Sequence, residues 1–392
     1  MKFEDGNELI PEERTGMFFH TKKIAVLIGI ILLVGCQNKE RAIEQFNTRT
    51  QQIQQRAVPD LRLNVFDAHL TRQGGNWVLQ GETTVPEARK QVIGFADSLL
   101  GKDNYRADFL LLPHPDLGDS SYGIIQVSTA HLRDAPKHAA QLVDQDIMGK
   151  VIRLLKRKQG WYLVQTDYGY IGWMRRESFR RLDLPGVETW KQHANLRVTG
   201  LFALIYSKPN ENSPPVCDVV LNSLLRQIRK GKTWTKVATP DGRVGYIRSK
   251  YVTANTYQTL SARELRSKII DTARQMMGIP YLWGGNTSTG NDCSGFTQTV
   301  FEANGIKLLR DANQQANEGK EIIPDETFSN VLPGDLLFFG SKDKIVHVGI
   351  SLGGAEFIHQ SGDVHINSLD PKAENYSPGR RKSLQKIVRV IQ

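Results

Sequence analysis

A glycine-rich loop runs directly into a helical pattern at residues 281–305, and a cysteine lies at the junction. The stretch reads YLWGGNTSTGNDCSGFTQTVFEANG, with helical spacing from Ser294 onward. A helix N-terminus carries partial positive charge and free N–H groups, which favour a thiolate. We therefore expect Cys293 to have a lowered pKa and to act as a nucleophile. The alternative role is that of a small buried structural cysteine.

Two downstream histidines offer the base and the orienting group that a thiol nucleophile needs. The sequence KIVHVGISLGGAEFIHQSG predicts a hairpin with His347 on the first strand and His359 on the second. A three-residue loop, Leu352–Gly354, would pair residue 347 with residue 359 and place both imidazoles on one face. A two-residue loop would place them on opposite faces. We expect the three-residue loop.

Residues 261–392 have the pattern of an α+β domain. Ser261 and Glu264 form a capping box ahead of an apolar helical face, and a second helix is expected from about Ser294 to Asn304. Strand candidates follow at 335–339, 346–351, 356–359 and 387–391. Helices followed by a mostly antiparallel sheet predict an α+β fold.

The preceding residues repeat one plan of short strands and turns, first at 120–184 and again at 190–256. Each copy contains an HLR or NLR strand, a W-x-x-V strand, and a GYIGW or VGYIR strand. The spacing predicts two small barrels of five to six strands. Both copies resemble bacterial SH3-like domains. Before them, residues 37–115 predict a polar helix and a small β-β-α-β unit, to which we assign no chemistry.

The N-terminus has the pattern of an export signal at residues 1–36. Two lysines precede a run of twelve apolar residues, which is too short to span a bilayer as a mature helix. The run ends in LVGC, which resembles the bacterial lipobox and implies lipidation at Cys36. Gln37 follows, and this favours the outer over the inner membrane. The first sixteen residues are acidic and do not suit a signal, so we expect translation to start at Met17.

Four motifs resemble the NlpC/p60 cysteine peptidases along residues 262–392: PYLWGG, DCSGF, LPGDLLFF and HVGISLGGAEFIH. The resemblance implies a papain-like fold and cleavage of peptidoglycan stem peptides. It also implies that Cys293 is the nucleophile, His347 the general base and His359 its orienting partner. The Cys293 N–H and the Tyr281 hydroxyl would stabilise the oxyanion.

Two SH3-like domains before such a catalytic domain resemble the γ-D-glutamyl-L-diamino acid endopeptidases, which act on stems with a free N-terminal L-Ala. This resemblance implies that Tyr170, in the GY-x-GW strand, binds near that amine. It further implies that Asp292 and Ser294, on either side of the nucleophile, hold the amine. The segment LLRDANQQ departs from many relatives, which have proline before Arg-Asp.

The composition limits the other possibilities. Three cysteines are too few and too scattered for a disulfide framework or a zinc site, so we expect no metal or cofactor. The net charge is +10, and residues 190–261 alone carry eleven Lys/Arg against three Asp/Glu, which suits either an anionic partner or a solvated basic surface. An exported chain is not expected to bind nucleic acid. We expect a monomer that is anchored to the membrane by lipid and faces the cell envelope.

The leading hypothesis is hydrolysis of the γ-D-Glu–diamino acid bond, which releases L-Ala-γ-D-Glu during turnover of wall peptides. One alternative is an endopeptidase that acts on intact peptidoglycan, and another is a non-catalytic wall-binding lipoprotein. A third is an acyltransferase or lipid amidase on a related fold, although those enzymes usually have histidine before cysteine in the chain. The sequence leaves open whether the diamino acid is lysine or diaminopimelate.

Overall fold

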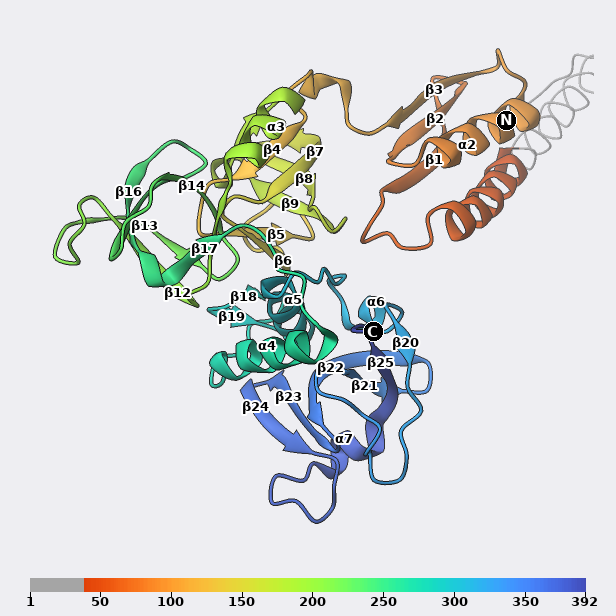
Figure 1. Ribbon diagram of the computed structural model, residues 1–392. Helices are drawn as coiled ribbons and strands as arrows, with labels where there is room; N and C mark the ends of the chain where they lie inside the picture. Colours follow the sequence, from red (N-terminus) through yellow and green to blue (C-terminus); the bar gives the residue numbers. More distant parts are fainter. Residues whose placement is uncertain (1–38) are drawn as a thin grey trace, which may run out of the picture. The chain divides into compact units, whose positions relative to one another are not determined.

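The computed structural model describes residues 39–392 (Figure 1), so Met17 and Cys36 lie outside the described residues. The chain divides into two compact units. One contains Phe66–Leu111 and the described residues before 60, and the other contains Asp60–Val65 and Leu112–Gln392. Within residues 39–392, no helix has the length and apolar character needed to cross a membrane.

The smaller unit is a three-stranded sheet with helices packed on it. Residues 39–57 are helical and are followed by β1 (Phe66–Gln73), β2 (Asn76–Thr83), α2 (Pro86–Leu100) and β3 (Tyr105–Leu111). Strand β2 pairs antiparallel with β1 and parallel with β3, and α2 forms the crossover that a parallel pair requires. Apolar residues of both helices and of all three strands share one core.

Two seven-stranded sheets of identical strand order begin the larger unit. The first follows the short 3₁₀ turn η1 (Pro115–Leu117) and has the order β10-β4-β7-β8-β9-β5-β6, and the second has the order β17-β11-β14-β15-β16-β12-β13. Each strand of the first sheet thus has the same neighbours as the strand of the second sheet whose number is seven higher. The prediction of five to six strands was too low, because β10 and β17 contain four and three residues, too few to show a pattern.

The strands of the first sheet are β4 (Tyr122–Ile125), β5 (Thr129–Arg133), β6 (Leu142–Ile147), β7 (Val151–Lys158), β8 (Trp161–Gln165), β9 (Ile171–Arg175) and β10 (Phe179–Leu182). Those of the second are β11 (Leu196–Val198), β12 (Phe202–Tyr206), β13 (Pro215–Val220), β14 (Leu224–Arg229), β15 (Trp234–Ala238), β16 (Val244–Arg248) and β17 (Val252–Ala254). The 3₁₀ turns η2 (Arg176–Ser178) and η3 (Ser249–Tyr251) precede the last strand of each sheet, and α3 (Leu184–His193) connects the two sheets.

The C-terminal part is a six-stranded antiparallel sheet with the order β20-β25-β21-β22-β23-β24. The strands are β20 (Lys320–Glu321), β21 (Leu336–Ser341), β22 (Lys344–Gly353), β23 (Glu356–Ser361), β24 (Asp363–Ser368) and β25 (Leu384–Arg389). The helices are α4 (Ala262–Gln275), α5 (Cys293–Ala303), α6 (Ala312–Gln315) and α7 (Pro378–Ser383), and β18 (Asn286–Thr287) with β19 (Gly290–Asn291) forms a short hairpin. This arrangement confirms the predicted α+β fold class.

Helices α4 and α5 share one hydrophobic core with the sheet (Figure 1). The predicted capping box at Ser261 and Glu264 is present at the start of α4. Helix α5 is buried from its first residue to Phe301, since β22 and β23 pack against it and the second SH3-like sheet also contacts it. In that last contact, Asn222 donates to the carbonyl of Thr299 at 3.1 Å.

The hairpin of β22 and β23 determines how the two histidines relate. Its loop has two residues, Gly354–Ala355, and Leu352 forms a bulge, so that Gly349 pairs with His359. The predicted pairing of His347 with His359 is therefore wrong. The bulge adds one residue and shifts the alternation of faces by one step. His347 lies two residues before Gly349 and is therefore on the same face of the sheet as His359. The predicted three-residue loop without a bulge would have given the same shared face.

Candidate active site

Helix α5 begins at the candidate nucleophile. Asp292 caps the helix by accepting the N–H of Gly295 at 2.8 Å, and its own N–H donates to the carbonyl of Gly285. Gly295 has no space for a side chain, because a Cβ there would lie 2.1 Å from the Gly285 carbonyl oxygen. The glycine-rich loop and the helix start are thus packed directly together, and they hold Cys293 at the first helical position with 8% of its surface exposed.

The Cys293 sulfur lies against strand β22. The N–H groups of Val348, next to His347, and of Ser294 both point to the sulfur and would stabilise a thiolate. Burial nevertheless raises the pKa of Cys293 to about 11, and the negative charge of Asp292 adds to this effect. The prediction of a lowered pKa is therefore wrong for the free protein, because desolvation outweighs the field of the helix. The resting nucleophile is a thiol.

A chain of hydrogen bonds fixes the tautomers of both histidines. The Nδ2 group of Asn367 donates to the carbonyl of Asn375 at 3.2 Å, so the Oδ1 atom of Asn367 faces His359. That oxygen can only accept, so the Nε2–H of His359 donates to it at 2.9 Å. The Nδ1 atom of His359 then accepts from the Nε2–H of His347 at 2.8 Å. The Nδ1 atom of His347 is left without a proton and can accept one from Cys293.

Both imidazoles are held neutral. Burial lowers the pKa of His347 to about 2, and the positive charge of Arg380 contributes. Burial also lowers the pKa of His359 to about 3. Because the thiol and the imidazole are both neutral, His347 can act as a general base only when proton transfer is coupled to attack on a substrate.

Donors for an oxyanion are found at the start of α5 and on the preceding loop. The Asp292, Ser294 and Gly295 N–H groups have partners, so the Cys293 N–H is the remaining donor of the first turn. Burial raises the pKa of Tyr281 to about 12, and the charge of a Cys293 thiolate adds to this shift, so its hydroxyl stays protonated beside the sulfur. Both groups are available as donors, and their role at an oxyanion stays a prediction.

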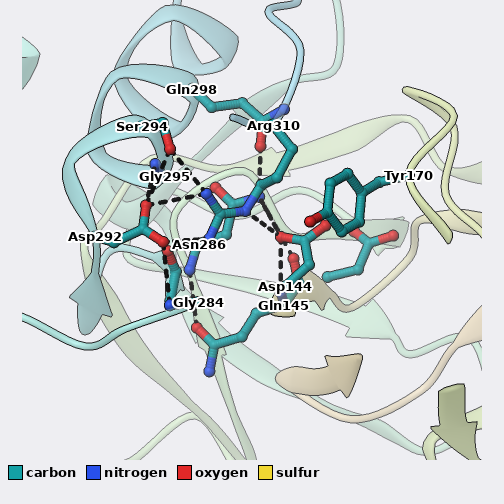
Figure 2. A network of polar contacts seen from close by, with 12 residues as sticks. Asp144, Gln145, Tyr170, Gly284, Asn286, Asp292, Ser294, Gly295, Gln298 and Arg310 are labelled. Carbon is teal, nitrogen blue, oxygen red and sulfur yellow. Dashed lines mark hydrogen bonds and ion pairs between the residues drawn. The ribbon is translucent and has the colours of Figure 1, made fainter. Parts of the chain in front are cut away.

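A fully buried arginine joins the nucleophile loop to the first SH3-like sheet. Figure 2 shows the guanidinium of Arg310 between the carboxylates of Asp292 and Asp144. It donates to both oxygens of Asp292 at 2.9 and 2.6 Å and to Asp144 at 2.6 Å. The remaining N–H groups reach the Ser294 hydroxyl at 3.0 Å and the Gly285 carbonyl at 3.2 Å.

Asp144 on β6 is the contribution of the SH3-like sheet to this cluster. Burial raises its pKa to about 6 despite the positive charge of Arg310. The hydroxyl of Tyr168 and the side-chain amide of Asn286 also donate to its carboxylate. Tyr168 belongs to the same SH3-like domain, whereas Arg310 and Asn286 come from the catalytic domain, so undocking would leave the carboxylate without its only cation among the described partners.

The cluster changes the role expected of Asp292 and Ser294. Both oxygens of Asp292 are bound by Arg310, and they also accept the N–H groups of Gly284 and Gly295. The Ser294 hydroxyl donates to Asp292 and accepts from Arg310. The expectation that these two side chains hold a substrate amine is therefore corrected, because their hydrogen-bonding capacity is used within the protein.

A second carboxylate lies where Tyr170 meets the catalytic domain. Tyr170 directly precedes β9 and is buried, and its hydroxyl is 3.4 Å from Oδ2 of Asp311. Arg62 donates to the same oxygen at 2.8 Å, and Asp60 binds Arg62 through both of its oxygens. Burial disfavours ionisation of Asp60, but hydrogen bonds from Arg62 and Gln314 lower its pKa to about 2.

The segment that carries Asp311 flanks the nucleophile. Arg310 binds the residues on either side of Cys293, and Gln315 donates to the carbonyl of Ser294 at 3.1 Å. Asp311, Arg62 and Asn367 were not among the site residues predicted from the sequence. The Arg-Asp pair in LLRDANQQ was a visible signal for Asp311, whereas nothing in the local pattern marked the other two.

Comparison with known proteins agrees with this geometry. Residues 278–380 match the NlpC/P60 family, and residues 132–179 match the bacterial dipeptidyl-peptidase Sh3 domain. "Dipeptidyl-peptidase 6" of Lysinibacillus sphaericus is 30% identical over 262 residues, which cover 64% of this chain and 93% of that protein. The chain belongs to the NlpC/P60 family. It is a cysteine peptidase of that family, with an SH3 domain before the catalytic domain.

Two further NlpC/P60 relatives come from Bacillus cereus. "Gamma-D-glutamyl-L-lysine dipeptidyl-peptidase" is 27% identical over 267 residues, which cover 62% of this chain and 76% of that protein. A crystal structure of an NlpC/P60 family protein from the same species has a TM-score of 0.60 at 24% identity and covers 69% of this chain and all of that one. This second likeness supports the fold.

The neutral state of the thiol can be tested by alkylation. Because burial raises the pKa of Cys293 to about 11, the rate of its reaction with iodoacetamide should rise about ten-fold per pH unit between pH 6 and 9. Mass spectrometry of the peptides separates Cys293 from Cys217, whose pKa is also raised to about 11 and which serves as an internal comparison. A rate for Cys293 that is constant from pH 5 upward would indicate a thiolate–imidazolium pair and contradict this description.

The buried cluster makes a prediction about stability. Arg310→Met leaves Asp144 and Asp292 without their cation and should lower the free energy of unfolding by about 3–5 kcal/mol. Lys307→Met, which removes an exposed pair with Asp167, should cost less than about 1 kcal/mol. Urea unfolding of both variants measures the difference. Equal stability of the Arg310 variant and the unmodified protein would refute the role given to the cluster.

Proposed function

We propose that this peptidase hydrolyses the γ-D-glutamyl–diamino acid bond of peptidoglycan stem peptides that have a free N-terminal L-Ala, and releases L-Ala-γ-D-Glu. One observation carries the proposal. Tyr170 of the first SH3-like sheet meets Asp311 on the segment that flanks Cys293, which supplies an acidic position near the nucleophile. Both relatives are named dipeptidyl-peptidases, and the name of the second contains the γ-D-glutamyl-L-lysine bond, which supports the proposed bond.

The chemistry follows from the orientation of the histidines. As the Cys293 sulfur attacks the γ-carbonyl carbon, its proton moves to Nδ1 of His347, and the oxyanion accepts hydrogen bonds from the Cys293 N–H and the Tyr281 hydroxyl. His359 accepts the now charged Nε2–H of His347 and stabilises the imidazolium.

His347 then gives its proton to the leaving amine, and the C–N bond breaks to leave a thioester. Water attacks the thioester with His347 again as the base, which releases the dipeptide and restores the thiol.

The charge of the cluster around Asp311 would select substrates with a free N-terminal amine. Asp60 and Asp311 together with Arg62 comprise two carboxylates and one guanidinium, so the cluster retains one negative charge. A protonated N-terminal amine would balance that charge, and burial keeps Tyr170 a neutral hydroxyl beside it by raising its pKa. In a stem that is still linked to glycan the same nitrogen is acylated, so it carries no charge and more bulk.

The catalytic assignment predicts a graded series of variants. Cys293→Ala should abolish hydrolysis, and His347→Ala should lower kcat by about 10²–10⁴-fold, because it removes the base. His359→Gln should be milder, since an amide oxygen can still accept from Nε2 of His347. Steady-state rates on L-Ala-γ-D-Glu-L-Lys measure the series, with circular dichroism as the check on folding. More than a trace of activity in purified Cys293→Ala would exclude the thiol mechanism.

Selectivity for the free amine forms a separate prediction. We expect kcat/KM to be about ten- to a hundred-fold higher for the free tripeptide than for its N-acetyl form, as the loss of one charge-assisted hydrogen bond implies. Asp311→Asn should lower the rate on the free peptide and reduce this ratio. Asp271→Asn makes the same change of charge on the exposed face of α4 and should alter neither rate.

The outcome of this comparison also decides between the two leading functions. Equal rates on free and acetylated peptides would contradict the proposal. They would favour an endopeptidase that acts on intact peptidoglycan.

A further inference from the structure

A cation that the reaction scheme leaves unassigned lies on the histidine side of the site. Helix α7 places the guanidinium of Arg380 over the ring of Phe339, with 5.5 Å between Cζ and the ring centroid. The same ring is 5.7 Å from the imidazole of His347, centroid to centroid, and the two residues pair across β21 and β22. Arg380 also donates to the hydroxyl of Ser361 at 3.2 Å.

This guanidinium is not neutralised within the part of the chain that the structure describes. Its contacts there are a hydroxyl and an aromatic ring, neither of which carries a charge. Arg310 and Arg389, in contrast, are each bound by carboxylates. A half-buried cation without a counter-ion costs desolvation free energy, so a site that keeps one is built to receive an anion.

The electrostatic effects of Arg380 place it at the reacting groups. Burial lowers its pKa, and a Cys293 thiolate would raise it again, so the two charges interact. After burial, the charge of Arg380 is the next contribution that lowers the pKa of His347. These effects agree with the ring contacts that join Arg380 to His347 through Phe339.

Arg380 lies on the His347 side of the site, and this position indicates which part of the substrate it would contact. Under the proposed function, His347 protonates the leaving amine, so the diamino acid must lie next to His347. That residue carries an α-carboxylate when it ends the peptide. Diaminopimelate carries a second carboxylate at the end of its side chain beside an ammonium group, whereas lysine has the ammonium group alone.

We propose that Arg380 binds a carboxylate of the leaving diamino acid and thereby selects substrates by the charge of their leaving group. This inference rests on the proposed function. The carboxylate can be the terminal α-carboxylate or that of a diaminopimelate side chain, and both present the same planar anion to the guanidinium. The ammonium group of a lysine side chain does not bind at this position.

The test compares four peptides that share the L-Ala-γ-D-Glu portion. They end in L-Lys, in L-Lys amide, in meso-diaminopimelate, and in meso-diaminopimelate with its α-carboxylate amidated. L-Lys amide offers Arg380 no carboxylate and serves as the reference substrate. Its rate also reports whether each variant is folded. Arg380→Gln is compared with Arg381→Gln, which removes the neighbouring exposed guanidinium that lies over Phe328.

We expect Arg380→Gln to lower kcat/KM about ten- to a hundred-fold for a peptide with the recognised carboxylate and little for L-Lys amide. Arg381→Gln should change none of the four rates. A loss confined to peptides with a free α-carboxylate identifies the terminal group. A loss that persists on the amidated diaminopimelate peptide identifies the side chain.

Two results would overturn the inference. An equal loss on all four peptides would mean that Arg380 acts on the thiolate and not on the leaving group, and no loss would exclude any role. Failure of the unmodified enzyme to cleave any of the four peptides would instead refute the proposed function, on which the inference rests.

Discussion

The buried guanidinium of Arg310 is the interaction on which the site depends. It binds the cap of the helix that starts at Cys293, and it binds Asp144 of the first SH3-like sheet. Arg310 and Asp292 lie in the catalytic domain, so separating the domains would leave Asp144 without its cation and expose the Arg310–Asp292 pair. The SH3-like sheet is consequently part of the catalytic architecture. It also brings the Tyr170 hydroxyl to Asp311, and under the proposed function this contact forms one wall of the position for the substrate amine.

Desolvation sets the chemistry of the catalytic groups. Burial keeps Cys293 a thiol and both histidines neutral, so no ion pair has to be stabilised before substrate arrives. Direction comes from the hydrogen-bond chain that starts at the carbonyl of Asn375 and leaves Nδ1 of His347 as the single acceptor for the thiol proton. Under the proposed function, the net negative cluster at Asp311 lies at the amine end of the substrate, and Arg380, which is unpaired in the described residues, lies at the leaving-group end.

The sequence predicts what is local. The capping box of α4, the start of α5 at the cysteine and the shared face of the two histidines follow from spacing, and the bulge at Leu352 preserved that face although the expected pairing was wrong. Long-range partners were not accessible. Asp292 was assigned to substrate because its partner Arg310 is 18 residues away, and Asn367 was missed because β24 was not recognised as a strand. The shift of the Cys293 pKa depends on burial, which a local pattern does not report.

A crystal structure of Cys293→Ala with bound L-Ala-γ-D-Glu-meso-diaminopimelate would locate both ends of the substrate at once, because the tripeptide stays intact. We expect the L-Ala amine within hydrogen-bond distance of Asp311, the γ-carbonyl oxygen at the Cys293 N–H, and a diaminopimelate carboxylate on Arg380. A peptide bound in the reverse direction, or an amine directed into solvent with Asp311 still held only by Arg62 and Tyr170, would contradict it.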